Sequence, residues 1–266
     1  MPATQTTTLG RKWLFKMCIF IAAGVILAAW GALDAGVVYP ARGARAAERL
    51  EFLYLDAVTE RGTRPVMVSF EPVAERDRLA KEAGLGAISA QDKLKLDWLG
   101  QLALIGKLGT ERITIPDAAA RYTELSKTWL TAGGTSGNAV PLASYDIPVQ
   151  WGICILGAAL AGWLTVHVVR VAGRKFCWDP GEKRLTLPDG SSLVPGDIAE
   201  FDKRKWDKFL IFLKVKAGHD RLGGREMVLD LYHHAPLEDW VLEMERTAFP
   251  ENTASAPTEA PPVPAA

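Results

Sequence analysis

The stretch of sequence that decides the fold is LFKMCIFIAAGVILAAWGAL, residues 14–33. A second apolar stretch, WGICILGAALAGWLTVHVV, occupies residues 151–169. A helix needs about 20 predominantly apolar residues to cross the hydrocarbon core of a bilayer, and each stretch is about that long. We therefore predict an α+β membrane protein with two transmembrane helices, over residues 13–33 and 148–171.

Basic residues flank the two stretches in a way that predicts topology. Arg11 and Lys12 precede the first stretch, and Lys16 lies near its start. Arg170, Arg174 and Lys175 follow the second. Positive charge near the ends of a span marks its cytoplasmic side. We therefore predict a multi-pass protein of the plasma (inner) membrane with both termini cytoplasmic. Residues 1–12 form the cytoplasmic N-terminus and residues 34–147 lie outside.

The first stretch has an alternative interpretation as a cleaved signal peptide, because a basic start followed by an apolar run is typical of one. The run is long for that role, and the residues around Trp30 make a poor cleavage site. His167 lies inside the second stretch, where an ionisable side chain is a functional candidate. Its closeness to Arg170 favours a solvated position near the interface over a proton relay.

Small residues recur four positions apart in both stretches, a spacing that lets helix backbones approach closely in lipid. These candidate helix-packing residues are Gly24, Ala28, Gly157, Ala158, Ala161 and Gly162. Two interpretations stay open. The two helices can pack on each other, which we favour, or a face can pair with a second copy of the chain.

Residues 34–147 predict a mainly helical extracytoplasmic domain. Helices are expected over Pro72–Gly84, from Ser89 with Asp92 in a capping-box arrangement, and from Thr114. The stretch AGGTSGNAVPLAS, residues 132–144, is rich in glycine and serine and is expected to be a flexible linker. Acidic and basic residues alternate in ERDRLAKE, which indicates a solvated helix face.

In residues 172–250, apolar and polar residues alternate with period two between Pro and Gly turns, which predicts short strands. A helix that begins near Pro236 is expected to end this domain. Residues 251–266 are rich in Ala, Pro and Thr and are expected to be a disordered tail. Trp178 and Trp240 are expected in the core. The strands and closing helix resemble a pleckstrin-homology-like (PH-like) fold over 175–249. The matching positions are Phe176, Trp178, Asp179, Leu185, Val194, Pro195, Asp197 and Ile198. The arrangement also resembles uncharacterised two-span membrane proteins of planctomycete-type bacteria.

The segment DKRKWDK, residues 202–208, joins two predicted strands and carries four cations beside a tryptophan. Cations close to a bilayer are attracted to anionic headgroups, and the PH-like resemblance implies the same role for a basic strand and loop. The candidate lipid contacts are Lys203, Arg204, Lys205, Trp206 and Lys208. The alternative is a solvated hairpin whose Trp206 folds back onto the domain.

Overall charge gives no sign of a nucleic-acid partner, because 31 basic residues balance 31 acidic ones. No catalytic constellation or cofactor motif is present, and the spacing of Cys18, Cys154 and Cys177 suits neither a disulfide framework nor a metal site. We expect a non-enzymatic adaptor or scaffold without cofactors. Its expected contacts are the lipid bilayer and protein partners, and a homo-oligomer stays open as an alternative. The alternatives are an accessory subunit of a lipid- or envelope-modifying enzyme and a small transporter subunit.

Overall fold

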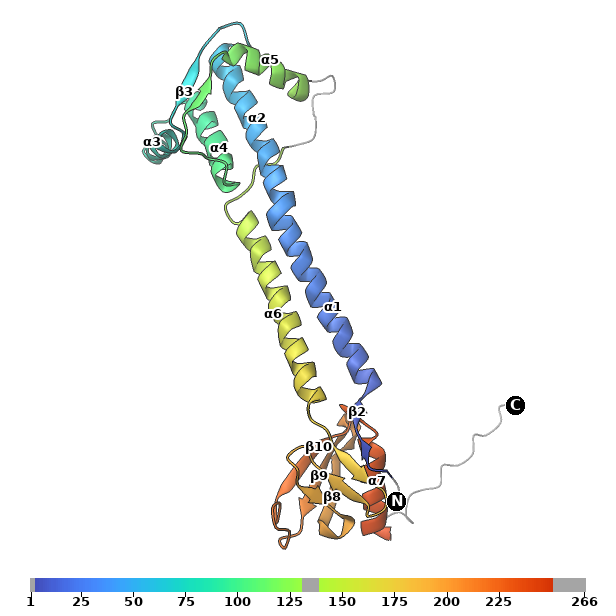
Figure 1. Ribbon diagram of the computed structural model, residues 1–266. Coiled ribbons are helices and arrows are strands. Elements are labelled where there is room, and N and C mark those ends of the chain that lie inside the picture. The colour runs from blue at the N-terminus through green and yellow to red at the C-terminus, as the bar shows by residue number, and fades with distance from the viewer. Residues whose placement is uncertain (1–2, 131–138, 251–266) are drawn as a thin grey trace, which may run out of the picture. The chain divides into compact units, whose positions relative to one another are not determined.

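The computed structural model describes residues 3–130 and 139–250. The chain divides into two compact units (Figure 1). A β-domain unit comprises residues 1–24 and 159–266, and a helical unit comprises residues 25–158. The predicted disordered tail and the first part of the predicted linker lie outside the described residues.

Two of the described helices are long and apolar enough to span a membrane, as judged by length and composition. Helix α1 covers Arg11–Leu33 and helix α6 covers Asp146–Ala172. At 1.5 Å per residue they extend about 35 and 40 Å, compared with about 30 Å for a hydrocarbon core. Only 11% and 17% of their apolar windows are buried within the protein. Large apolar side chains such as Phe20, Ile155 and Trp163 are therefore exposed.

Helix α1 does not stop where the predicted span ends. It continues through a π-helical turn, η1 (Asp34–Val38), into α2 (Tyr39–Thr59). Pro40 explains the wide turn, because it has no amide hydrogen and its ring crowds the preceding turn. The helix widens there, and the amide of Tyr39 donates to the carbonyl oxygen of Asp34.

The helical unit contains three more helices and a two-stranded sheet. Its elements are α3 (Pro72–Gly84), α4 (Ala90–Leu104), α5 (Ala118–Trp129), β3 (Val68–Phe70) and β4 (Ile113–Ile115). The predicted bounds of α3 are confirmed. The predicted cap of α4 is also confirmed, since Ser89 Oγ accepts from the amide of Asp92 at 3.0 Å.

The prediction of a helix from Thr114 was wrong. Residues 113–115 form β4, whose Thr114 pairs with Ser69 of β3. Asp117, and not Thr114, caps the next helix, because its Oδ1 accepts from the amides of Ala119 and Ala120 at 3.0 Å. The β-branched run Ile-Thr-Ile favours a strand, and Pro116 ends it.

Helices α4 and α5 both pack on α2 within the helical unit (Figure 1). Aromatic rings fill the space between them. Phe52 of α2 stacks on Tyr122 of α5 at 5.3 Å between centroids, and Tyr54 stacks on Trp98 of α4 at 5.8 Å. These contacts confirm that the aromatic residues of this region are core.

The β-domain consists of short antiparallel strands closed by one helix. The elements after α6 are β5 (Cys177–Asp179), β6 (Arg184–Thr186), β7 (Ser192–Leu193), η2 (Pro195–Asp197), β8 (Ile198–Lys205), η3 (Trp206–Lys208), β9 (Leu210–Val215), β10 (Glu226–Asp230), β11 (His234–Ala235) and α7 (Leu237–Ala248). The strands β10, β9 and β8 form one sheet. Trp206 lies in η3 and not in a strand.

Two strands that precede α1 belong to the same domain, and they were not predicted. Strand β1 (Gln5–Thr6) pairs with β5, and β2 (Thr8–Leu9) pairs with β11. The resulting sheets have the strand orders β1-β5-β6-β7 and β11-β2. Residues from both ends of the chain therefore build one domain.

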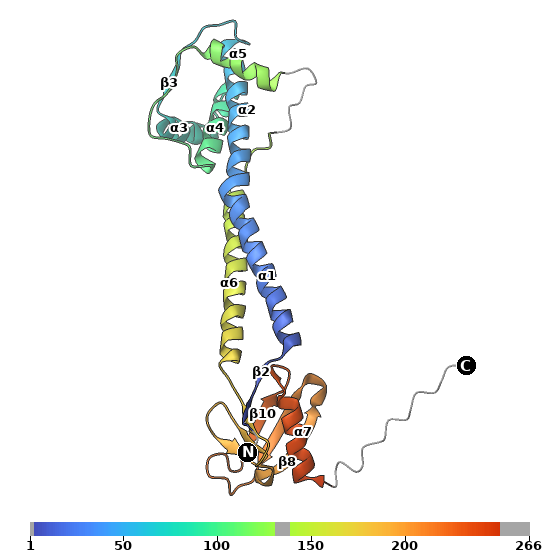
Figure 2. The ribbon, with the colours of Figure 1, turned by 45° about the vertical axis from the view of Figure 1, so that its right-hand side comes forward.

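The core of the β-domain holds both predicted tryptophans. Trp178 of β5 and Trp240 of α7 are 1% and 4% exposed, and their rings stack at 6.1 Å. Figure 2 shows α7 lying against the strands. The apolar face of this helix lies in the core, since Leu237, Val241 and Met244 are fully buried.

Candidate functional site

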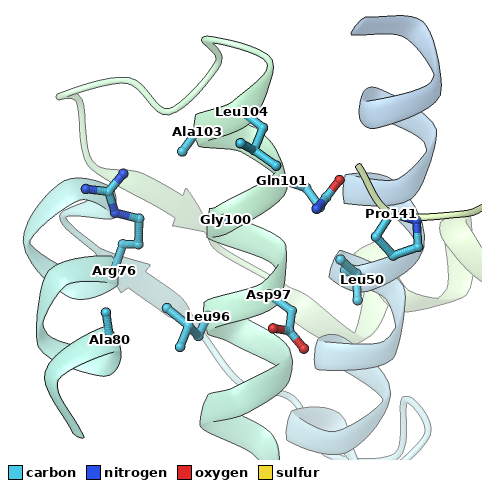
Figure 3. A pocket seen from close by; sticks show the side chains of 10 residues that line it. All are labelled: Leu50, Arg76, Ala80, Leu96, Asp97, Gly100, Gln101, Ala103, Leu104 and Pro141. Atoms are coloured by element: carbon cyan, nitrogen blue, oxygen red, sulfur yellow. The ribbon is translucent and has the colours of Figure 1, made fainter. Parts of the chain in front are cut away.

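The helical unit carries a groove of about 600 Å³ that runs over helix α4 (Figure 3). Gly100 lies in its floor, where an added Cβ would meet no atom within 4 Å. Figure 3 shows Leu50 of α2 and Pro141 on one side of α4, and Arg76 and Ala80 of α3 on the other. The missing side chain at Gly100 thus helps to leave an apolar depression between two helices.

Asp97 gives the groove a negative charge. Its carboxylate is exposed at the rim and has no hydrogen-bond or ion-pair partner within the described residues. Partial burial raises the pKa of Asp97, and the nearby Lys93 opposes that rise. The Arg76 guanidinium across α4 is held by its neighbour Asp77 at 2.7 Å. The groove can therefore accept an apolar surface that also carries a positive charge.

The segment that leads into α6 is docked beside this groove. Gln101 of α4 donates to the carbonyl oxygen of Leu142 at 3.0 Å and accepts from its amide at 2.8 Å. Arg42 of α2 forms an ion pair with Asp146 at 3.2 Å. In its described part, the predicted flexible linker is thus fixed, and Leu142 is 5% exposed.

A buried charge cluster lies beneath the same helices. Lys95 of α4 is 9% exposed and forms a short ion pair with Glu75 of α3. Its ammonium also lies 4.0 Å from the centroid of the Phe70 ring. Hydrogen bonds from Arg78, and then from Lys95, lower the pKa of Glu75 to about 2. Burial raises the pKa of the adjacent Tyr54 to about 12, with smaller contributions from Asp92 and Glu75.

This cluster was not predicted, and the alternating charges of ERDRLAKE had indicated a solvated face for Glu75. A signal was nevertheless present at Lys95, which lies three positions before Trp98 and four before Leu99 on the buried stripe of α4. A charged residue at such a position has to find a partner. Its neutralising contacts tie α3 to α4 and indicate a structural role.

The basic segment 202–208 was predicted to join two strands, but residues 202–205 belong to β8 itself, and only residues 206–208, in η3, lie between β8 and β9. Lys203 pairs with Glu245 at 2.5 Å and lies over the Trp206 ring, and Arg204 pairs with Glu226 at 2.9 Å. Trp206 is half-buried and packs against the domain core. Lys205 and Lys208 are exposed and have no ion-pair partner in the described part of the chain. Lipid contact by this segment stays a prediction, with these two cations as its most available members.

The predicted small-residue positions differ in exposure. Gly24, Gly157 and Ala161 are buried, Ala28 is half-buried, and Ala158 and Gly162 are exposed. Helices α1 and α6 approach closely at Gly31, which was not predicted. An added Cβ there would lie 2.7 Å from both the Cys154 amide nitrogen and the Gln150 carbonyl oxygen. The sequence signal for this close approach was the seven-residue spacing between Gly24 and Gly31.

An aromatic and histidine cluster lies in the β-domain unit where α1 begins. Trp13 is 3% exposed, and its ring lies 4.8 Å from His233 and 6.0 Å from His167. The Nδ1 atom of His233 lies 3.2 Å from a carboxylate oxygen of Asp230. Burial lowers the pKa of His233, and Asp230 opposes this shift. His167 is therefore half-buried against aromatic rings and not simply solvated.

The described residues contain no group of three His, Cys, Asp or Glu side chains that could hold a metal ion. Comparisons with protein-family models, with curated proteins and with solved structures found no match to this chain.

Proposed function

We propose that the chain is a two-span protein of the plasma membrane that acts as a non-enzymatic adaptor. In this proposal its helical unit faces outward and its β-domain, including the strands before α1, lies in the cytoplasm. The observation that carries the membrane assignment is the apolar surface of α1 and α6. A soluble helix buries most of such a surface, whereas these helices leave it exposed.

The pairing of β1 with β5 supports the proposed topology. Gln5 pairs with Trp178 and Thr6 pairs with Cys177, so the segments before α1 and after α6 must be on the same side of any membrane. Two crossings satisfy this condition and a single crossing does not. Cleavage of α1 as a signal peptide would also remove both N-terminal strands from the β-domain.

Reporter fusions test this topology. A fusion at Ala132 should report an outside location, and a fusion at Ala256 should report an inside location. The protein should also resist extraction from membranes at alkaline pH. An inside signal at Ala132, an outside signal at Ala256 or release by alkali would reject the two-span proposal.

The adaptor role rests on the groove over α4, which offers an apolar floor beside the unpaired Asp97 carboxylate. We propose that a protein partner inserts an apolar side chain next to a cationic one. The Gly100→Phe substitution should fill the groove while leaving α4 intact, because glycine is the weaker helix former. Affinity capture of the full chain from gently solubilised membranes should lose its partners in this variant.

Ala57→Phe is the matched control, since Ala57 is an exposed residue of α2 outside the groove. It adds the same ring and should retain the partners. Equal capture by both variants would reject the groove as the docking site. An enzyme among the captured proteins would instead favour the role of an accessory subunit.

A further inference from the structure

The β-domain unit contains a cavity of about 700 Å³ at the junction between β2 and α1. Residues 8–13 line one part of it, and residues around Tyr232 and Glu238 line another. We propose that this cavity binds the headgroup of a zwitterionic phospholipid with a primary ammonium, of the phosphoethanolamine class. The inference rests on the proposed membrane insertion of α1.

The cationic part of the cavity is formed by Arg11 and Lys12 in the first turn of α1. Both side chains are exposed, and neither has an ion-pair partner within the described residues. Amides in the first turn of a helix also attract negative charge. A phosphodiester group fits this part of the cavity, because it is the anionic component of every phospholipid headgroup.

The anionic part is formed by Glu238 and Asp239 in the first turn of α7. They too have no ion-pair partner among residues 3–130 and 139–250. The two cations and two anions line one cavity without pairing to each other, which leaves both sets available to a ligand. A ligand with both charges satisfies both, and a primary ammonium can donate hydrogen bonds to the two carboxylates.

Tyr232 also lines the cavity. Its hydroxyl oxygen is buried and has no hydrogen-bond partner in the described structure. The ring of Tyr232, and not its hydroxyl, therefore forms this part of the wall.

The position of the cavity favours a lipid as the source of this chemistry. The apolar run of α1 begins directly after Trp13, which is a lining residue and 3% exposed. Tryptophan near the end of a span lies at the headgroup level of a bilayer. In an inserted chain, phospholipid headgroups would therefore be the most concentrated zwitterions beside the cavity.

Native mass spectrometry of the delipidated full chain in detergent tests the proposal. Phosphatidylethanolamine, phosphatidylcholine and phosphatidylglycerol are added one at a time. We expect phosphatidylethanolamine adducts to exceed each of the others by about fivefold, which corresponds to about 1 kcal/mol. Equal retention of the three lipids would overturn the inference.

Substitutions in the cavity identify the side chains responsible for the lipid preference. The double variant Glu238→Gln and Asp239→Asn should abolish the preference for phosphatidylethanolamine and favour phosphatidylglycerol. The double variant Arg11→Gln and Lys12→Gln should weaken the binding of all three lipids. Lys214→Gln with Arg225→Gln removes two cations outside the cavity and should change nothing. A preference that survives the Glu238 and Asp239 double variant would contradict the proposal.

Glycerophosphoethanolamine, the headgroup without acyl chains, separates headgroup recognition from acyl-chain binding. It should displace the lipid at high concentration, and failure to do so would overturn a headgroup site. Alkaline extraction of membranes that contain the chain distinguishes failure of the headgroup proposal from failure of the membrane proposal. A chain that stays in the membrane but shows no lipid preference contradicts only this inference, and a chain that is extracted contradicts the membrane proposal itself.

Discussion

Gly10 is the residue at which the chain leaves β2 for α1, and it tolerates no side chain. An added Cβ would lie 2.6 Å from the carbonyl oxygen of Tyr232. The Gly10 amide also donates to the carbonyl oxygen of His233 at 2.8 Å. Because the clash is with backbone, Gly10→Ala should lower the free energy of unfolding by about 1–3 kcal/mol. Thermal unfolding of the full chain in detergent measures this. Gly196→Ala, where a Cβ meets nothing within 4 Å, should have little effect.

Glu75 and Lys95 should respond unequally to substitution. Glu75→Gln leaves the buried Lys95 ammonium without a carboxylate and should cost about 2–4 kcal/mol. Lys95→Met should cost about 1 kcal/mol, because Glu75 keeps its ion pair with Arg78 at 2.9 Å. Unfolding followed by tryptophan fluorescence measures both costs. Equal costs would contradict the expectation that Lys95 depends on Glu75 more than Glu75 depends on Lys95.

Glu75 also predicts acid sensitivity of the helical unit. Its pKa is about 2 in the folded protein and 4.5 ordinarily, so it stabilises the fold fully above about pH 4.5. This stabilisation is lost as the pH falls toward 2 and amounts to a free energy on the order of 2 kcal/mol. The Glu75→Gln variant should lose this part of the pH dependence. A variant with the same acid profile as the wild type would contradict the assignment.

At the scale of elements, strand β1 should stabilise the β-domain through its backbone. Gln5→Pro with Thr6→Pro removes two amide donors from the strand that pairs with β5, and we expect Trp178 to become accessible to a fluorescence quencher. Gln5→Ala with Thr6→Ala keeps the amides and should keep Trp178 protected. Accessible Trp178 in both variants would show that side chains, and not strand pairing, matter here.

The basic segment 202–208, at the end of β8 and in η3, contains paired and unpaired cations that can be tested separately. Lys205→Gln with Lys208→Gln removes unpaired charges and should weaken binding of the purified chain to anionic vesicles by about 1 kcal/mol per cation, an effect that added salt screens. Lys203→Gln with Arg204→Gln breaks the ion pairs with Glu245 and Glu226 and should instead lower stability. Vesicle binding at low salt that is unchanged in the first variant would exclude lipid contact by this segment.

Elements that depend on local signals were predictable from sequence. The range Pro72–Gly84 follows from a proline start and helical spacing, and the apolar face of α7 follows from its period. The elements that were missed depend on distant partners. Strand β1 has two residues and exists because Trp178 and Cys177 supply its pairing. The groove over α4 likewise requires α2, α3 and Pro141 to come together, and no local pattern specifies that.

At the scale of the whole molecule, the N-terminal strands distinguish an anchor from a signal peptide. Intact-mass measurement of the membrane-extracted protein should show a chain that retains residues 3–30. The reason is that removal of this segment would delete β1 and β2 from the β-domain. A mature chain that begins after Trp30 would contradict both the two-span topology and the domain as described.

The pairing of β1 with β5 also sets an order of events during synthesis. Gln5 and Trp178 are 173 positions apart (178 minus 5). At about 5–20 residues per second, the ribosome needs roughly 10 to 30 s to supply the partner of the first strand. Both apolar helices emerge during this interval. In the proposed two-span topology, the β-domain can therefore close only after both helices have entered the membrane. A nascent chain with one helix misplaced would keep an open strand edge, a feature by which a protease or chaperone could detect it.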